Sequence, residues 1–255
     1  DSIPGENLRK AKAAYYALAE LLDSWIGRTL ATLEETGLAR DTIVIYFSDH
    51  GEMLGEHGRW HKGCFFEASA RVPLIIRLPG RNNAGRKIPE VVSLLDLLPT
   101  ICEWGKAEIF SRVRGKSLVP LINGKADSWA NITKSEYYDR GCNRMLRKGK
   151  WKLCFYGNHE DCELYDLESD PGEKHNRADD PACRQVVGEL KGLIFNDGWN
   201  TDILKINDDK LNGYGYYEMI RRFGNTAVSN PLLKDLPDYW LGSRNCKNYV
   251  EPVQG

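Results

Sequence analysis

A carboxylate, an imidazole and an amine occur close together within residues 48–63. Asp49 and His50 are adjacent, and Lys62 follows after a loop rich in glycine. Carboxylate oxygen and imidazole nitrogen are both metal ligands: zinc accepts the two readily, whereas calcium prefers oxygen and binds imidazole less often. An ammonium group beside such a pair could hold an anionic substrate. Two ligands are too few for a metal site, so we expect the others to come from elsewhere.

The residues before this segment predict the element that positions it. Residues 42–47 form an uninterrupted β-branched and aromatic run, which is typical of a buried strand. In an open α/β sheet, ligands gather beyond the carboxyl ends of the strands. We therefore expect Asp49 and His50 to point into one cleft at the end of this strand.

The neighbours of Lys62 are apolar: Trp60, Cys64, Phe65 and Phe66. They predict a desolvated ammonium group, which needs a bound anion to stay charged. His61 adjoins Lys62 and is the better candidate of the two loop histidines for a contact with an anionic oxygen; His57 is the other. We interpret Glu52 and Glu56 as supporting or surface groups, and Asp96 as a structural polar residue.

The remaining patterns predict two regions. Helical spacing at residues 8–33, a strand at 72–78 and a helix at 91–104 are typical of an α/β sheet, and we assign residues 1–125 to this domain. Short aromatic stretches at residues 135–138, 144–147, 151–156 and 163–167 predict an antiparallel meander. A helix at residues 185–195 would pack on it. Residues 126–255 thus form a smaller domain with an irregular tail after residue 198.

The composition restricts which partners the chain can bind and whether disulfides stabilise its fold. The chain has 255 residues and a formal net charge of -1, which gives no sign of a nucleic-acid partner. We expect no membrane span, because no apolar run is long enough. The odd number of cysteines, seven, argues against a disulfide framework. A single disulfide between Cys154 and Cys162 stays an alternative, although two reduced, packed thiols are favoured. The compartment stays undetermined: periplasmic, secreted or lysosomal-type with an upstream signal peptide, otherwise cytoplasmic.

Taken together, the motifs resemble those of the type I sulfatases of the alkaline phosphatase superfamily, most of all the iduronate-2-sulfatase and choline-sulfatase-like branch. The motifs that carry the resemblance lie between about residues 8 and 195. They include Ser48-Asp49-His50-Gly51, Leu54-Gly55-Glu56-His57-Gly58, Trp60 with Lys62, Arg71-Val72-Pro73-Leu74-Ile75, Leu94-Leu95-Asp96-Leu97-Leu98-Pro99-Thr100, and Leu164-Tyr165-Asp166-Leu167 with Asp170-Pro171 and Glu173.

The resemblance implies an alkaline-phosphatase-like sheet and hydrolysis of a sulfated small molecule or sulfated sugar. Asp49 and His50 match two calcium ligands of the family, and Lys62 matches the catalytic lysine that holds a sulfate oxygen. The family's nucleophile is a formylglycine made from Cys or Ser in a Cys/Ser-x-Pro/Ala-x-Arg motif, which these residues lack. We therefore expect a C-terminal half whose partner is a missing N-terminal half. Such a half should expose apolar surface; homo-oligomer formation stays open.

Two alternatives remain. The first is a phosphodiesterase or phosphonate monoester hydrolase of the same superfamily, which would share the segment that carries the candidate metal ligands. A non-catalytic binding protein descended from a sulfatase is the other, although the presence of Asp49, His50 and Lys62 together counts against it.

Overall fold

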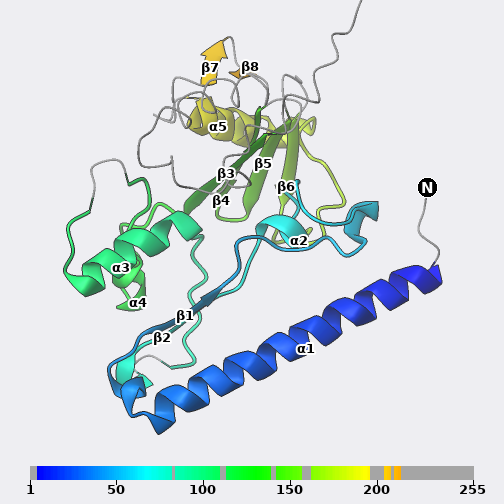
Figure 1. The fold of residues 1–255 in the computed structure, drawn as a ribbon. Coiled ribbons are helices and arrows are strands. Elements are labelled where there is room, and N and C mark those ends of the chain that lie inside the picture. The colour runs from blue at the N-terminus through cyan, green and yellow to red at the C-terminus, as the bar shows by residue number, and fades with distance from the viewer. Residues whose placement is uncertain are drawn as a thin grey trace, which may run out of the picture. The chain divides into compact units, whose positions relative to one another are not determined.

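A computed structural model describes residues 5–81, 84–109, 113–138, 142–156, 162–195, 204–207 and 210–213 (Figure 1). The chain divides into two compact units. The first contains Asp1–Thr133, Arg147–Lys150 and Asp166–Lys174; the second contains Lys134–Leu146, Trp151–Tyr165 and His175–Gly255. The first unit therefore includes two short segments from late in the chain.

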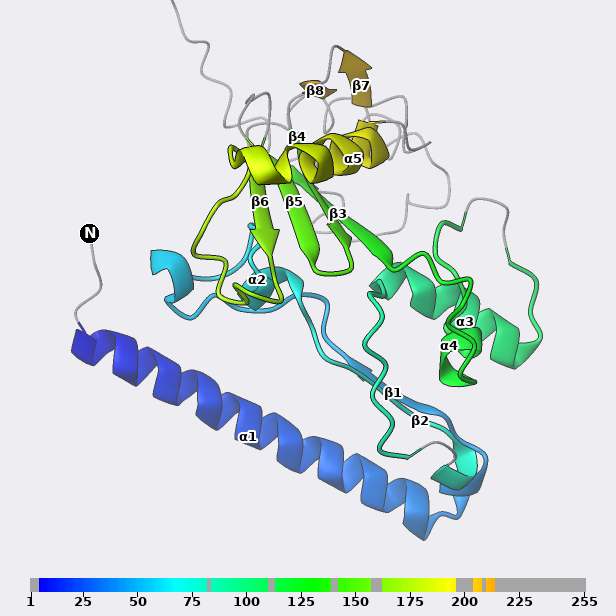
Figure 2. The same cartoon turned by 180° about the vertical axis from the view of Figure 1, so that it is seen from behind.

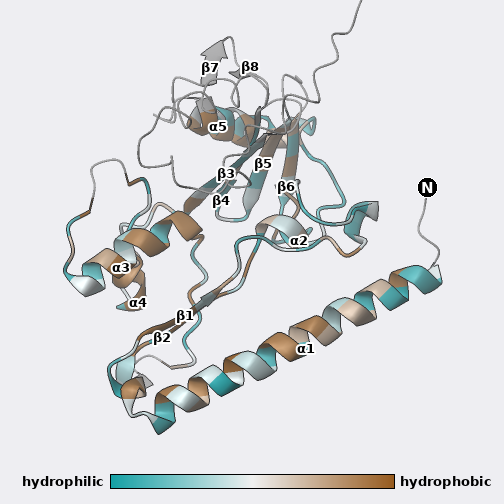
Figure 3. Cartoon of the chain, viewed as in Figure 1, coloured by the Kyte–Doolittle hydropathy of each residue, from teal (hydrophilic) through white to brown (hydrophobic). Residues whose placement is uncertain are grey.

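The first unit begins with the long helix α1 (Gly5–Glu35), which ends just before Gly37, a residue with φ 72°. None of its residues is buried, and apolar bands run along its length (Figure 3). Leu18 and Trp25 are 65% and 60% exposed. The expected exposure of apolar surface is thus confirmed, and the predicted helix at 8–33 lies within α1.

The strand that leads into the candidate site is β1 (Val44–Phe47). It pairs antiparallel with β2 (Leu74–Arg77), with Ile45 opposite Ile76. One set of side chains from this ribbon packs against a buried cluster, formed by Leu97, Leu118, Leu121 and Ile122. The other face is open, because Ile75 on that face is 61% exposed. Phe47, which shares the covered face with Ile45 at the end of the strand, is 47% exposed. The prediction of a buried strand was therefore wrong for the described chain: only one face of the ribbon is covered.

The predicted helix at 91–104 begins later than expected. A 3₁₀ turn, η4 (Leu94–Asp96), precedes the helix α3 (Leu97–Gly105). Ser93 caps this turn: its hydroxyl accepts from the Leu95 N–H, while Asp96 Oδ2 accepts from the Ser93 N–H. Asp96 is buried and its other oxygen accepts from the Lys116 N–H at 2.8 Å. Its predicted structural role is confirmed.

Four strands form a second sheet in the order β3-β4-β5-β6, the order expected for a meander. They are β3 (Ile132–Tyr138), β4 (Cys142–Lys148), β5 (Trp151–Tyr156) and β6 (Cys162–Asp166). The helix α5 (Arg184–Phe195) lies across one face of this sheet (Figure 2). Each predicted strand and the predicted helix are found. Cys154 and Cys162 are both reduced, as favoured.

The region after residue 198 contains more order than predicted. The strands β7 (Leu204–Asn207) and β8 (Lys210–Gly213) form an antiparallel pair. The sequence allows two interpretations of Tyr214, Tyr216 and Tyr217, as lining of a sugar or choline pocket or, more commonly for aromatic residues, as core; all three lie outside the described residues. The other short elements are η1 (Leu38–Arg40), η2 (Glu56–Gly58), α2 (Glu67–Ala70), η3 (Pro79–Arg81), α4 (Val119–Ile122) and η5 (Pro181–Cys183). Among the helices that the structure describes, none has the length and apolar character needed to cross a bilayer.

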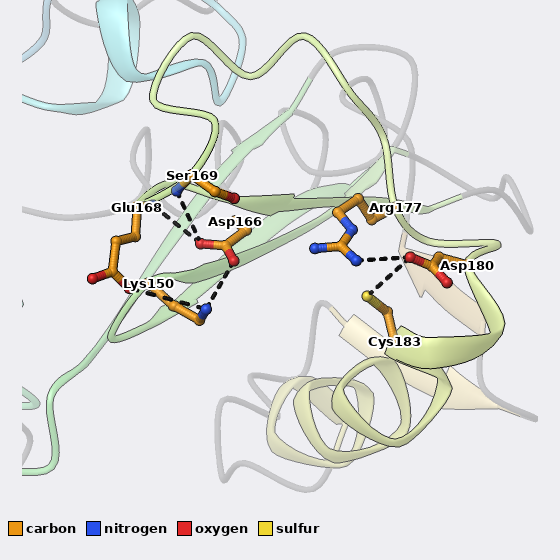
Figure 4. Close-up of polar contacts among 7 residues, drawn as sticks. All are labelled: Lys150, Asp166, Glu168, Ser169, Arg177, Asp180 and Cys183. Atoms are coloured by element: carbon orange, nitrogen blue, oxygen red, sulfur yellow. Dashed lines mark hydrogen bonds and ion pairs between the residues drawn. The ribbon is translucent and has the colours of Figure 1, made fainter.

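The buried carboxylate of Asp166 organises the turn after β6 (Figure 4). Asp166 Oδ2 accepts from Lys150 Nζ at 2.8 Å, and Oδ1 accepts from the N–H groups of Glu168 and Ser169. Burial raises the pKa of this carboxyl, but the Lys150 hydrogen bond and the backbone donors outweigh burial and leave the pKa below its ordinary value. In the second unit, Asp180 similarly accepts from Arg177 and from the Cys183 thiol.

This lowered pKa predicts a contribution of Asp166 to acid unfolding. A carboxyl group with a depressed folded-state pKa stabilises the fold above its unfolded pKa of about 3.9, and this contribution is lost as the pH falls through the folded value. We expect Asp166→Asn to lower stability by about 1 kcal/mol at pH 7, since Lys150 is partly exposed. The variant should also lose less stability than the wild type below pH 4. Urea unfolding at several pH values measures this, with Asp127→Asn as an exposed control; equal acid slopes for wild type and Asp166→Asn would contradict it.

Candidate active site

Three side chains converge just beyond the end of β1. His50 lies at the centre: its Nε2 atom is 2.7 Å from Lys62 Nζ and 3.6 Å from Asp49 Oδ2. The hydroxyl of Ser48 donates to the His50 carbonyl oxygen at 2.8 Å and so holds the backbone where the strand ends. The structure thus brings together three of the four site residues that the sequence predicts. We call Asp49, His50 and Lys62 the polar cluster.

The hydrogen bonds of His50 define which ring nitrogen is available. Nδ1 lies 2.8 Å from the Gly51 carbonyl oxygen, which can only accept. Nδ1 therefore carries the proton, and Nε2 presents its lone pair to the ammonium group of Lys62. The same lone pair would bind a cation in place of the lysine hydrogen bond, because a neutral imidazole ligates through its unprotonated nitrogen.

Asp49 is held as a carboxylate. Its Oδ1 accepts from the His50 N–H at 2.9 Å, and its side chain is 83% exposed. This backbone hydrogen bond is the main reason why the pKa of Asp49 is below its ordinary value, and the nearby positive charge of Lys62 adds a smaller effect in the same direction. Asp49 therefore offers an ionised oxygen near His50 Nε2 at neutral pH.

The loop of residues 51–61 is closed by hydrogen bonds and places Lys62 next to His50. The Met53 N–H donates to the His61 carbonyl oxygen, and the Gly55 N–H donates to the Arg59 carbonyl oxygen, so the two sides of the loop are bonded to each other. Glu52 Oε1 accepts from the backbone N–H of His61 at 2.6 Å. The carboxylate of Glu52 thus fixes the residue immediately before Lys62, which agrees with a supporting role.

Lys62 is exposed, and the prediction that apolar neighbours desolvate it was wrong. Gly63 has φ 85° and turns the chain, after which Cys64 and Phe65 point into the interior. Cys64 packs there on the buried Met53. Because the apolar side chains lie on the inner side of the turn, the ammonium group of Lys62 faces solvent and His50.

The two loop histidines lie outside the polar cluster. His61 is tied by its backbone to Glu52 and Met53, and its side chain is exposed. The ring of His57 stacks on Phe66, with ring centroids 3.7 Å apart. His61 therefore stays a candidate substrate contact by prediction alone, and His57 has a packing role.

Gly51 connects the cluster to the short helix α2. Its N–H donates to the Ser69 carbonyl oxygen at 2.8 Å, and a β-carbon at this position would overlap the Ala68 carbonyl group. Only glycine allows the two backbones to approach this closely. This role of Gly51 was not predicted, although a glycine directly after two candidate ligands is a signal for close backbone approach.

The donors suit part of a divalent-cation site. An ionised carboxylate oxygen and an imidazole nitrogen with a fixed tautomer lie within 3.6 Å of each other. Within the described ranges, no three His, Cys, Asp or Glu side chains gather closely enough to hold a metal ion. The residues therefore fit such a group as two of its ligands, and a complete site needs additional donors.

Comparison with known families identifies the chain. Residues 55–197, more than half of its length, match the family model described as "N-sulphoglucosamine sulphohydrolase, C-terminal". The chain belongs to the sulfatase family. The predicted resemblance to the type I sulfatases is thereby confirmed.

Two curated relatives support this assignment. The sulfatase chain is 38% identical over 198 residues to a choline-sulfatase of Rhizobium meliloti, with 75% of this chain and 37% of the relative covered. It is 32% identical over 194 residues to an arylsulfatase of Clostridium perfringens, with 74% of this chain and 40% of the relative covered. The chain thus spans about two fifths of the length of these relatives.

Solved structures share the fold of this sulfatase chain. A 2-O GAG sulfatase superposes with a TM-score of 0.70 at 28% identity, covering 76% of this chain and 44% of that structure. The phosphonate monoester hydrolase of Agrobacterium radiobacter superposes with a TM-score of 0.69 at 27% identity, covering 83% of this chain and 46% of that structure. The expected α/β, alkaline-phosphatase-like fold class is confirmed.

Proposed function

We propose that this chain is the C-terminal part of an enzyme that hydrolyses sulfate esters to an alcohol and inorganic sulfate. The observation that carries the proposal is the polar cluster, in which Lys62 Nζ and Asp49 Oδ2 both approach His50 Nε2. The membership of the chain in the sulfatase family supports the reaction class.

Asp49 and His50 would hold a calcium ion through Oδ2 and Nε2, together with ligands from outside the described residues. A bound Ca²⁺ would polarise the sulfate group and offset its negative charge. The role of this chain is to present the two donors in a fixed arrangement. Nδ1 of His50 is locked by the Gly51 carbonyl oxygen, and Asp49 stays ionised.

Lys62 would donate hydrogen bonds to a sulfate oxygen. As sulfur is attacked, negative charge grows on the outer and leaving oxygens, so a cation already in place stabilises the transition state more than the ground state. Its present acceptor is a neutral imidazole nitrogen, a partner that an anionic oxygen would replace favourably.

The nucleophile would be a formylglycine supplied by sequence outside these 255 residues, because no Cys/Ser-x-Pro/Ala-x-Arg motif occurs in them. The substrate would be a sulfated small molecule or a sulfated sugar. The choline-sulfatase relative and the 2-O GAG sulfatase structure each support one of these classes.

A phosphonate monoester hydrolase is the second candidate, because an enzyme of that name shares the fold over 83% of this chain. Steady-state assays of the full-length protein with 4-nitrophenyl sulfate and with a 4-nitrophenyl phosphonate ester separate the two. We expect higher kcat/KM for the sulfate ester, loss of activity on chelation and recovery with Ca²⁺. A preference for the phosphonate ester would favour the second candidate, and no turnover of either ester would support a non-catalytic protein.

A further inference from the structure

The carboxylate of Glu173, far along the chain, contacts the helix α2, which lies next to the polar cluster. Glu173 lies in the segment Asp166–Lys174, which belongs to the first unit together with the cluster. Its Oε2 accepts from the backbone N–H of Glu67 at 2.6 Å, although the two residues are 106 positions apart. Glu173 is buried and has φ 52°, a backbone conformation that is costly for a residue with a side chain. The local fold therefore holds this side chain in one place.

The turn after β6 determines where Glu173 lies. Asp166 anchors this turn through Lys150, and the Asp170 N–H donates to the Asp166 carbonyl oxygen at 2.7 Å. The Glu173 N–H then donates to the Asp170 carbonyl oxygen at 3.1 Å. The position of the Glu173 carboxylate is thus set by a bonded turn rather than by a free loop.

The acceptor group of Glu173 caps the helix α2 from outside. Glu67 is the first residue of α2, and the preceding residue, Phe66, provides no side-chain cap. The first N–H groups of a helix need an acceptor, and a carboxylate also interacts favourably with the positive end of the helix. On its other side, Glu67 Oε2 pairs with Arg147 Nη1 at 3.2 Å. The start of α2 is therefore held at two points.

The helix α2 in turn sets the ring of His50. The Ser69 carbonyl oxygen of α2 accepts from the Gly51 N–H, and the Gly51 carbonyl oxygen accepts from His50 Nδ1. A shift of α2 would move the backbone of Gly51, and the hydrogen bond between its carbonyl oxygen and His50 Nδ1, which defines the tautomer of His50, would be lost. The hydrogen bond of Glu173 is thus connected to that of His50 through the backbone of α2, the Gly51–Ser69 hydrogen bond and the backbone of Gly51.

We propose that Glu173 is a positioning residue that keeps the imidazole of His50 oriented for metal binding. The metal part of this inference rests on the proposed function, whereas the orientation of His50 does not. Removal of a group that orients a metal ligand typically lowers metal affinity by about 10- to 100-fold. Because Glu173 acts through α2 and Gly51, we expect Glu173→Ala to weaken Ca²⁺ binding by about tenfold.

Two measurements on the full-length protein test this inference. Calorimetric titration with Ca²⁺ alone gives the affinity. Nitrogen-15 NMR of the histidine side chains, with the His50 signals assigned by comparison with His50→Ala, reports the proton on Nδ1 without any metal. We expect Glu173→Ala to bind Ca²⁺ about tenfold more weakly and to lose the slowly exchanging Nδ1–H signal. Glu173→Gln should restore both, since its amide oxygen can accept the same hydrogen bond.

A second variant keeps the test decisive if Glu173→Ala does not fold. Proline is tolerated at the first helical position and lacks the N–H donor, so Glu67→Pro removes the Glu173 contact. Glu67→Ala is its matched control, because both variants lose the Arg147 pair and only the proline loses the donor. We expect the proline variant to reproduce the loss of the Nδ1–H signal and the alanine variant to retain it.

The outcomes separate the two proposals. An unchanged His50 spectrum in Glu173→Ala or Glu67→Pro, or a loss that Glu173→Gln does not restore, would overturn the positioning role. A wild-type protein that binds no Ca²⁺ but shows the expected His50 changes would contradict the proposed metal and support the positioning role. Wild-type binding together with unchanged affinity in every variant would contradict only the role of Glu173.

Discussion

Replacement of Lys62 by alanine is expected to lower turnover of an aryl sulfate by about a hundredfold or more, the scale observed when one preorganised charge-stabilising donor is removed. The reason is that the ammonium group would gain more from the transition state than from the bound substrate. The fold should stay intact, because Lys62 is exposed and its ammonium group donates to His50 at the surface. Lys62→Arg should also be impaired, since a planar guanidinium does not replace a compact ammonium group.

Steady-state kinetics and thermal melts of the full-length protein measure this effect. Lys87→Ala is the matched control, because Lys87 is an exposed lysine away from the cluster. We expect kcat to fall for Lys62→Ala while its melting temperature stays near that of the wild type, and neither to change for the control. Turnover of Lys62→Ala close to that of the wild type would mean that Lys62 is an ordinary surface charge.

Asp49→Asn is expected to reduce Ca²⁺ affinity by about a hundredfold or more. Removal of a group that merely orients a metal ligand lowers metal affinity by about 10- to 100-fold. Loss of the charge of a ligand itself should lower the affinity by at least the upper part of this range. Calcium binds charged carboxylate oxygens in preference to neutral ones. The side chain of Asp49 is 83% exposed, so the substitution should leave the packing of the first unit unchanged.

Calcium titration of the full-length variant by calorimetry measures the change, with Asp127→Asn as the control for an exposed aspartate. Activity should fall in parallel and recover in part at high Ca²⁺. An Asp49→Asn variant with wild-type affinity would place the metal elsewhere, and this outcome would leave the family assignment unaffected. The experiment therefore tests the site separately from the family.

Much of the fold could be predicted from local patterns. The helical repeat of residues 8–33, the apolar run at 42–47, the meander strands and α5 all appear in the structure near their predicted positions. Such patterns are readable because the periodicity of apolar residues depends on the geometry of a single element. Asp49 and His50 were recognisable for the same reason, since adjacency at the end of a strand is a local property.

Elements that depend on neighbouring contacts were predicted less well. The start of α3 is set by the capping of Ser93 and Asp96, which overrode the apolar pattern that begins at residue 91. The exposure of Lys62 follows from the turn at Gly63, which directs Phe65 inward and the ammonium group outward. Composition around a residue does not determine which side of a turn its side chain occupies.

The sequence alone determined the family motifs, the order of the elements and the three residues of the polar cluster. Only the tertiary structure decided that Lys62 donates to His50, that Gly51 lies against α2, and that Glu173 caps this helix from 106 positions away. The physical reason is that these contacts join segments distant in the chain. Their geometry depends on how loops close and on which backbone groups still need a partner, and neither property is contained in a local pattern of residue types.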